Sequence, residues 1–532
     1  MLTVLTVAIG TEAHVFVDEA LQLAQVELVG DGSWTTERPF AEADAEAVHS
    51  PMTAVQFVGF DRYAPYVAHP ASVWASLAAD SIGGRFGIRM LSVLGVTGAA
   101  VCSGLMAERL RRGTGPPTLW ITGLLSPLVF DSQLMIAHGV AAGLVGAAAL
   151  VASTSDRRTP LVSAGAMAVL VGGAALFRSE VVIFAAAGAV ALTVAGLRAG
   201  RRSTVAAGVG TALGGALVFL VEPWWIGSLV DSSDISTKTI VASSRGGADG
   251  RVDAAFRVLV DPSYEGLVDA SVDIALIGAV LLVLGAALLA RRGRADLASV
   301  AAIAAVGLAA FRLADPTVTP GLLLAFPLLS VAALLVLIGV HRLVPFERVA
   351  LSAVGLFAVG VLLTQYSNGG GFEWGWRYVA VAVPVVAPTI TLCLDDLRMR
   401  LTRPAAMTLL GTMIVVSALV VASGLLEQRA IIDRTHVLEQ RLATEAAGSD
   451  RLVFLDSLLG RSMWELSLEG RVVTADNETA GEVLGWIDDA GEDDVLLVWS
   501  GAAQVPVGTG AFIPGRVVDL GVSNLHAVRL TT

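Results

Sequence analysis

The chain has 532 residues, of which 55% are hydrophobic and only 15% charged, and its mean hydropathy is +0.72. A soluble domain averages about 25% charged residues, so this composition excludes a water-soluble globule. The formal net charge is −12, and the 16 acidic and 7 basic residues from residue 430 onward carry −9 of it. This argues against a nucleic acid partner, because phosphate binding requires positive charge.

Apolar stretches recur along most of the chain, and a helix of about 20 apolar residues crosses a hydrocarbon core of about 30 Å. A transmembrane β-barrel would instead show short alternating strands, which are not seen. We therefore predict an α-helical polytopic membrane protein with thirteen spans, at 1–17, 87–107, 116–132, 134–152, 161–177, 181–197, 204–221, 269–290, 297–312, 319–340, 349–365, 378–394 and 405–425. The first is short and lacks a basic flank, which favours a truncated N-terminus over a cleavable signal peptide.

The orientation follows from the arginines, because cytoplasmic loops carry an excess of basic residues. The short loops on one side hold only Arg178, Arg312 and Arg377. Sixteen arginines lie in the loops on the other side: 109, 111, 112, 157, 158, 198, 201, 202, 291, 292, 294, 342, 348, 398, 400 and 403. We predict a multi-pass plasma-membrane protein with a cytoplasmic N-terminus and an extracytoplasmic C-terminal tail.

Two predicted outer loops are long, residues 18–86 and 222–268, and both are rich in charge and aromatic residues rather than Gly/Ser linkers. Long structured loops often carry function. The tail alternates strand-like and helix-like runs, at 451–456, 457–467, 471–475, 478–490 and 494–499. This pattern indicates a small α/β domain, so we predict a transmembrane domain over 1–425 and an extracytoplasmic domain over 426–532.

An acidic pair, Asp18 and Glu19, follows the first apolar segment. A carboxylate at the membrane edge, with its pKa raised by partial desolvation, is suited to deprotonate an acceptor hydroxyl. The alternative is an ordinary acidic helix start, since acidic residues favour a helix N-terminus.

Two histidines are candidate substrate contacts on the same predicted outer side. His69 precedes Pro70 in the first long loop, and His138 lies near the outer end of the fourth segment. A neutral imidazole orients hydroxyls or carboxylates. A turn residue at position 69 and an interfacial residue at 138 are the simpler alternatives.

Basic residues at the predicted outer ends of helices are candidate phosphate ligands, because a guanidinium grips a phosphate with two hydrogen bonds. They are Arg89, Arg178, Arg312 and Arg377, together with Lys238, the single lysine of the chain. Snorkelling toward anionic lipid headgroups is the alternative for each.

The segment from Ser367 to Tyr378 combines a run of three glycines, 369–371, and a fourth at 375 with Glu373, Trp374, Trp376 and Arg377. Glycines let the backbone approach a ligand closely, and tryptophans either stack on a sugar or belong to the interfacial aromatic belt. The belt explains the tryptophans but not the adjoining glycines and charges.

Together these motifs resemble the GT-C superfamily of membrane glycosyltransferases, which use polyprenyl-phosphate sugars. The likeness covers about residues 1–425, includes the count of thirteen helices and the extracytoplasmic C-terminal domain, and is nearest to the protein mannosyltransferase and lipid A aminoarabinose transferase type. In chain order the matching motifs are Asp18-Glu19, His69-Pro70, the run from Gly83 to Ser92 that contains Arg89, Arg178-Ser179-Glu180, and Gly375 to Tyr378 followed by Pro384.

The resemblance implies a catalytic base or metal ligand at Asp18, with Glu19 beside it, and lipid-phosphate binding by arginines such as Arg178 and Arg377. Glu180 belongs to the fourth of those motifs and is a further substrate-binding candidate. The family pattern continues after His-Pro with Pro-Leu-Tyr, whereas Ala71-Ser72-Val73 follows here. That departure leaves the identity of the transferred sugar undetermined.

The sequence thus predicts a glycosyltransferase, transferring a hexose or a pentose, that moves the sugar from a lipid-linked donor in the bilayer to an acceptor glycan, lipid or protein. A divalent metal ion is an open possibility. Two alternatives remain: a flippase or transporter of lipid-linked envelope intermediates, which should have charged or broken helices at mid-membrane, and a non-catalytic scaffold that presents the tail.

Overall fold

The computed structural model divides the chain into two compact units, and each is treated by itself. Unit 1 comprises Met1–Ile9, Phe86–Glu222 and Val241–Arg429, and unit 2 comprises Gly10–Arg85, Pro223–Ile240 and Ala430–Thr532. The residues that the structure describes are 1–15, 17–46, 48–49, 56–58, 61–230, 235–237, 248–263, 269–364, 374–456, 459–460, 463–502, 504–505, 508–522 and 524–532. The sequence-based division at residue 425 stays a prediction.

Within the described ranges, eight helices are long and apolar enough to cross a membrane. They are α3 (Pro70–Leu110), α7 (Pro160–Phe177), α8 (Glu180–Ala199), α9 (Arg202–Leu229), α12 (Ala270–Arg291), α13 (Ala295–Phe311, continued by the 3₁₀ turn η2, Arg312–Ala314), α16 (Pro345–Thr364) and α19 (Arg403–Glu445). Large apolar side chains such as Val169, Ile303 and Leu363 are more than half exposed, as expected of surfaces that face lipid. The predicted helical membrane fold is confirmed.

The predicted count of thirteen spans is not confirmed, because five of the predicted segments are short or interrupted. They fold as α1 (Leu2–Ile9), α4 (Gly115–Leu124) with α5 (Leu128–Asp131), α6 (His138–Ala152), α14 (Leu322–Ala325) with α15 (Pro327–Leu337), and α17 (Arg377–Ala380) with α18 (Val383–Met399). Prolines interrupt three of them, since Pro127 separates α4 from α5 while Pro327 and Pro384 lie in the first turns of α15 and α18. Broken helices at membrane depth require burial within protein.

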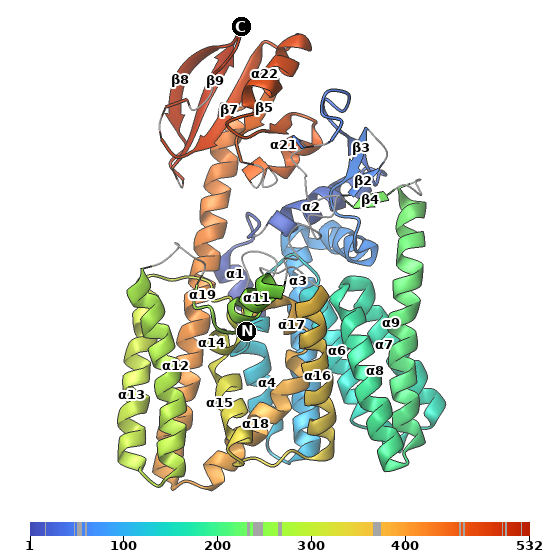
Figure 1. Ribbon diagram of the computed structural model, residues 1–532, viewed down its shortest axis with the longest axis vertical. Coiled ribbons are helices and arrows are strands. Elements are labelled where there is room, and N and C mark those ends of the chain that lie inside the picture. The colour runs from blue at the N-terminus through green and yellow to red at the C-terminus, as the bar shows by residue number, and fades with distance from the viewer. Residues whose placement is uncertain are drawn as a thin grey trace. The chain divides into compact units, whose positions relative to one another are not determined.

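The remaining elements of unit 1 are the 3₁₀ turn η1 (Ser155–Arg157) and α11 (Ala248–Val260), which precedes α12. Figure 1 shows α12 and α13 as neighbouring helices, and the connection Arg292–Arg294 makes them an antiparallel hairpin. One large apolar core joins α3, α12, α13, α15, α18 and α19, and a second joins α6, α7, α8, α16 and α17.

Helices α3 and α6 touch at glycines, and this contact fixes where α6 begins. A Cβ added to Gly95 would lie 2.3 Å from the backbone of Gly139, and one added to Gly143 would lie 2.6 Å from the carbonyl oxygen of Gly95. Small residues spaced four apart let helix backbones approach closely in membranes. The Ser92 hydroxyl also donates to the Ile136 carbonyl at 2.8 Å, which anchors the turn before α6.

Unit 2 contains α2 (Val17–Gly30), the start of α3 and a small sheet in the order β1 (Thr36–Glu37), β3 (Arg62–Ala64), β2 (Gln56–Val58), β4 (Ile235–Thr237). Helix α3 thus begins at Pro70, inside the predicted loop 18–86, and has non-helical backbone angles at Gly83 and Gly84. Helix α1 ends before Gly10, whose φ of 99° stops a helix. The predicted helix over 1–17 is therefore wrong.

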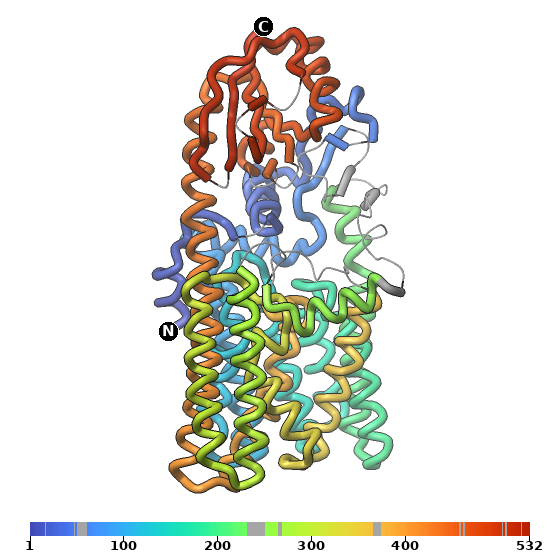
Figure 2. The backbone as a smooth tube through the Cα atoms, turned by 60° about the vertical axis from the view of Figure 1, so that its left-hand side comes forward, coloured from blue at the N-terminus to red at the C-terminus, as the bar shows by residue number. Residues whose placement is uncertain are grey.

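The C-terminal part of unit 2 is a five-stranded sheet, seen at the red end of the tube in Figure 2. Its order is β6 (Val472–Thr474), β5 (Arg451–Phe454), β7 (Asp494–Ser500), β9 (Leu525–Thr531), β8 (Ile513–Asp519). The first three are parallel and the last two antiparallel. The chain between them adds α21 (Trp464–Leu468) and α22 (Ala480–Asp489). This confirms the predicted α/β fold.

Alternating residues of the strands pack on opposite faces of this sheet, as a period of two requires. Leu452 and Phe454 of β5 join Leu442 of the C-terminal part of α19 in one core, whereas Val453 joins Leu484 of α22 in another. The first predicted outer loop is part of the same unit: the hydroxyl of the fully buried Tyr63 donates to the Ser467 carbonyl at 3.2 Å.

Candidate active site

Five ionisable residues of unit 1 form a buried group that we name the Asp131 cluster. Each lies at a helix terminus: Asp131 ends α5, His138 begins α6, Arg178 follows α7, Glu180 begins α8 and Arg377 begins α17. None is more than 6% exposed. Ionisable groups in apolar surroundings are costly and are functional candidates by default.

Arg178 and Glu180 form the centre of the cluster. The Arg178 Nε donates to Glu180 Oε1 at 2.9 Å, and the His138 Nε2 lies 3.6 Å from the same oxygen. The loss of one partner from a buried pair of this kind costs about 3–5 kcal/mol. Asp131 is close enough to Arg377, Arg178 and Glu180 to interact electrostatically with each, which joins α5 and α17 to the group.

The break between α7 and α8 positions the pair. Helix α7 ends at Phe177, Arg178 has an extended backbone with φ of −152°, and α8 starts at Glu180. A carboxylate in the first turn of a helix is stabilised by the positive end of the helix dipole. Two residues of opposite charge therefore emerge from adjacent helix ends at one point.

The two residues before Arg377 have a left-handed backbone conformation, which sets the direction of the chain at Arg377. Gly375 has φ of 60° and Trp376 φ of 56°, a conformation that costs a non-glycine residue about 1–2 kcal/mol. Their backbone N–H groups donate to the carbonyls of Thr319 and Pro320, both at 2.9 Å. A Cβ on Gly375 would lie 2.5 Å from Pro127 Cγ, so glycine is required here.

Three acceptor oxygens in this region, Asp131 Oδ2, Gln133 Oε1 and Glu180 Oε2, are buried and have no hydrogen-bonding partner among the described residues. Buried polar atoms are almost always hydrogen bonded, and exceptions call for an explanation such as a bound molecule. These three oxygens need hydrogen-bond donors, and sugar hydroxyls can donate hydrogen bonds. Buried arginines and buried acceptor oxygens thus occur in one unit.

The structure brings four of the predicted site residues together, namely His138, Arg178, Glu180 and Arg377. Arg89 belongs to unit 1 as well and is fully buried in α3. Lys238 and Glu373 lie outside the described residues. All of these assignments to substrate binding stay predictions.

Trp374 and Trp376 are buried in unit 1, and packing accounts for their position. The ring of Trp374 stacks on Phe130 with centroids 5.9 Å apart, and a Cβ added to Gly424 would lie 2.3 Å from it. Trp376 joins the apolar core that includes α8 and α16. Their predicted role in stacking on a sugar is untested.

Asp18, Glu19 and His69 belong to unit 2. Asp18 is half-buried in the first turn of α2, and the buried Glu19 accepts from the Val15 N–H at 2.5 Å. The His69 carbonyl accepts from the N–H groups of Ser72 and Val73, so it caps α3 at the proline that starts it. Their predicted catalytic and binding roles stay predictions, as does the metal role of Asp18. Within the described ranges, no three His, Cys, Asp or Glu side chains gather as a metal-binding group.

Asp131 and Gln133 were missed as candidates by the sequence reasoning. A signal was present, because the run Asp131-Ser132-Gln133 interrupts two apolar segments. A carboxylate placed at the end of a predicted span is a functional candidate by the same rule that selected the arginines.

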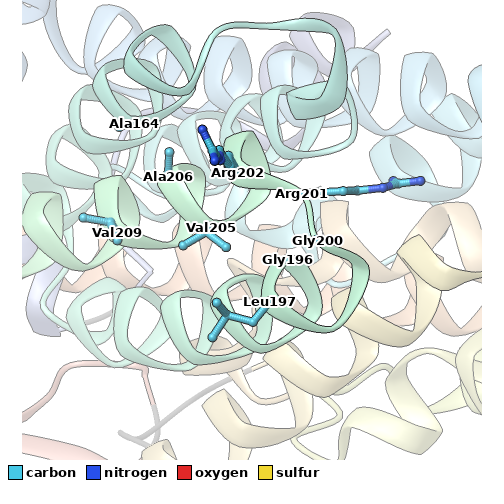
Figure 3. Close-up of a pocket in the computed structure, with 9 residues that line it drawn as sticks. All are labelled: Ala164, Gly196, Leu197, Gly200, Arg201, Arg202, Val205, Ala206 and Val209. Carbon is cyan, nitrogen blue, oxygen red and sulfur yellow. The ribbon is translucent and has the colours of Figure 1, made fainter.

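A cavity of about 540 Å³ lies elsewhere in unit 1, between the end of α8 and the start of α9, with Ala164 of α7 in its lining. Figure 3 shows Arg202 beside Ala206 at this cavity, while the side chain of Arg201 extends away from it. Arg201 is paired with Asp156. The cavity shares no residue with the Asp131 cluster, and its lining is mainly apolar and small, so it is not the candidate active site.

Comparison with known structures decides the fold. ArnT from Cupriavidus metallidurans, in a crystal structure with bound undecaprenyl phosphate, matches over 99% of this chain and 96% of its own, with a TM-score of 0.52 and 11% identity. The chain has the GT-C fold. The apo crystal structure of the same protein covers 99% of this chain and 95% of its own, with a TM-score of 0.49 and 12% identity. No family model and no curated protein sequence matches.

The GT-C fold agrees with the likeness drawn from the motifs. The structural match spans 99% of the chain, whereas the motifs that carried the sequence resemblance all lie within about residues 1–425. At 11% identity the match concerns the fold. The chemistry has to be argued from the side chains of this chain.

Proposed function

We propose that this protein is a membrane glycosyltransferase that moves a sugar from a polyprenyl-phosphate donor to an acceptor hydroxyl on the extracytoplasmic face, in the synthesis of envelope glycans or glycoproteins. The observation that carries the proposal is the Asp131 cluster, in which two buried arginines and two buried carboxylates meet in a chain with the GT-C fold. ArnT with bound undecaprenyl phosphate supports a lipid-phosphate donor.

Arg178 and Arg377 are assigned to the phosphate of the donor. A guanidinium offers paired N–H donors that match phosphate oxygens, and burial strengthens the attraction because little water screens it. As the sugar leaves, the bridging oxygen gains negative charge, which is where preorganised cations lower the barrier most.

Asp131, Gln133 and Glu180 are assigned to the hydroxyls of the sugar, because each carries a buried acceptor oxygen without a described partner. His138, which lies 3.6 Å from Glu180, would orient that carboxylate. Buried acceptors of this kind discriminate among sugars. A sugar that lacks the matching hydroxyl leaves the acceptor oxygen unpaired, and its binding is weakened.

Asp18 is assigned as the general base. In the proposed reaction the acceptor oxygen forms a bond to the anomeric carbon, its proton goes to the Asp18 carboxylate, and the bond from that carbon to the phosphate oxygen breaks with its electron pair staying on the phosphate. The products are the glycosylated acceptor, with inverted anomeric configuration, and a polyprenyl phosphate. A divalent cation would assist the leaving phosphate if it binds there.

The experiment is transfer by purified protein from a panel of radiolabelled polyprenyl-phosphate hexoses and pentoses to an envelope extract as acceptor. We expect one donor to be consumed and polyprenyl phosphate to be released. D18N should abolish transfer, whereas the matched control D31N, at the exposed end of α2, should not change it. Full activity in D18N would refute the base assignment.

A flippase or transporter remains a second candidate, because the interrupted helices α4–α5, α14–α15 and α17–α18 are a feature of transporters. The same experiment separates the two functions. A transporter leaves the bond between sugar and phosphate intact, so labelled donor would be recovered unchanged after it crosses a vesicle membrane.

A further inference from the structure

Arg312 is fully buried, and its guanidinium is engaged by protein groups. The Nη1 donates to Asp273 Oδ1 at 2.9 Å, and the Nη2 donates to the Pro262 carbonyl at 2.6 Å and to the Thr319 hydroxyl at 3.2 Å. Asp273 is itself held, since the Ser263 hydroxyl donates to its Oδ2 at 2.7 Å. Both terminal nitrogens of Arg312 therefore bind protein oxygens, which does not fit a phosphate ligand.

These contacts fix the buried segment 317–321 between α13 and α14. The segment forms neither a helix nor a strand, so its backbone polar groups need partners from elsewhere. The Thr317 N–H donates to the Ser423 hydroxyl at 3.2 Å, and the Gly321 N–H donates to the Asp261 carbonyl at 2.9 Å. Arg312 holds the middle of the segment through Thr319.

The same segment supports the left-handed turn that precedes Arg377. The carbonyls of Thr319 and Pro320 accept the N–H groups of Gly375 and Trp376, both at 2.9 Å. A non-glycine residue in a left-handed conformation persists only where its surroundings enforce it. A shift of residues 319 and 320 would release Trp376 and redirect Arg377, the next residue along the chain.

We propose that Arg312 is a positioning residue for Arg377: through Thr319 it fixes the backbone that aims the Arg377 guanidinium at the donor phosphate. This inference rests on the proposed function, in which Arg377 binds that phosphate. It assigns Arg312 a different task from Arg178 and Arg377, although all three were candidate phosphate ligands in the sequence.

The test uses full-length purified protein and two measurements: the Kd for undecaprenyl phosphate, and the donor KM and kcat for sugar transfer. R312K keeps the positive charge but loses the planar set of N–H donors that a guanidinium offers. T319V removes only the hydroxyl that accepts from Arg312 and serves as the second variant if R312K does not fold. R294Q, at the exposed opposite end of α13, is the matched control.

We expect R312K and T319V to raise both the Kd and the donor KM about 10-fold and to lower kcat as well, because a redirected Arg377 also stabilises the leaving phosphate less. R294Q should behave as wild type. In an R377Q background, R312K and T319V should cause no further loss of donor binding or transfer. The effects of residues that act through one another are not additive. A residue that only stabilises the fold would lower activity by the same factor in both backgrounds.

Equal losses in the wild-type and R377Q backgrounds, or unchanged Kd and KM in both T319V and R312K, would overturn the positioning role. Wild-type protein that binds no undecaprenyl phosphate and transfers no sugar would overturn the proposed function, and this inference with it. The two failures are therefore distinguishable.

Discussion

Two ionic groups of unit 1, one buried and one partly buried, differ in how completely their polar atoms are paired. In the group that we name the His341 cluster, the imidazole Nδ1 lies 2.7 Å from Asp396 and the Nε2 lies 3.0 Å from Glu347. Arg111 donates to Asp395 at 2.8 Å and to Asp396 at 2.7 Å. In the Asp131 cluster, by contrast, oxygens of Asp131 and Glu180 are buried without described partners.

The difference supports the proposal that the Asp131 cluster binds substrate, whereas the His341 cluster has a structural role. Every buried charge of the His341 cluster faces an opposite charge at hydrogen-bonding distance, which joins the ends of α3, α15, α16 and α18. Such a group stabilises the bundle and has no capacity left for a ligand. The Asp131 cluster keeps unsatisfied acceptors at a cost in stability, which is typical of sites that bind substrate.

The largest expected effect is on catalysis by the Asp131 cluster. R377Q removes a cation from the proposed phosphate site, so kcat/KM for transfer should fall about 10³-fold. R111Q, which removes an arginine from the other group, should lower the thermal unfolding midpoint and leave kcat/KM nearly unchanged. Steady-state kinetics and thermal melts of both variants measure these two effects. Near-normal kcat/KM in R377Q would contradict the functional role of the Asp131 cluster.

The next effect is on the stability that the His341 cluster provides. Glu347 is fully buried and pairs with His341, which is 4% exposed. E347Q should destabilise the folded protein by about 3 kcal/mol, since it breaks a buried pair. Tryptophan fluorescence during thermal unfolding measures this. An unchanged midpoint would mean that the group contributes little to the bundle.

A smaller effect of opposite sign on stability is expected for Asp131. D131N keeps the shape of the side chain but replaces a carboxylate that has an unsatisfied buried oxygen. We expect kcat/KM to fall about 10- to 100-fold, because a charge-assisted hydrogen bond is worth about 1.5–3 kcal/mol. The unfolding midpoint should stay equal or rise. A clear loss of stability without a loss of kcat/KM would assign Asp131 a structural role.

The smallest effect is a pH dependence of stability from His341. The hydrogen bond to Glu347, and then that to Asp396, raise the pKa of His341 from its ordinary value of 6.5 against the opposing effect of burial. The protonated ring donates to both carboxylates, whereas the neutral ring has one N–H. The stabilisation is therefore fully present below pH 6.5 and is lost as pH rises through the raised pKa.

H341Q should flatten this dependence. The measurement is the thermal unfolding midpoint of the wild-type and H341Q proteins between pH 6 and 9, in steps of roughly one pH unit. Parallel curves for the two proteins would show that another group dominates the pH response.

Much of the fold was predictable from the sequence, because long apolar runs determine membrane helices directly. The eight long helices include eight of the segments predicted as spans, and the strands β5, β6 and β7 fall where they were predicted. Strands β8 and β9 were not predicted. The helix breaks were also missed, because Pro127 and Pro327 lie inside apolar runs whose length alone suggested continuous spans.

The candidate site was predictable in part. Arg178 and Arg377 were selected because charged residues at helix ends are conspicuous in an apolar chain, and Glu180 was selected through the family resemblance. The distinction between Arg377 and Arg312 could not be drawn, since it depends on which arginine Asp273 and Thr319 contact after folding. Asp131 was passed over because it lies at the end of an apparently unbroken span.

The most direct test of the central claim is a cryo-electron microscopy structure of the purified protein with undecaprenyl phosphate. The account predicts phosphate density within about 3 Å of the guanidinium nitrogens of Arg178 and Arg377, as charge-assisted hydrogen bonds require. Phosphate density away from both arginines, with the Asp131 cluster unchanged and filled only by water, would contradict it.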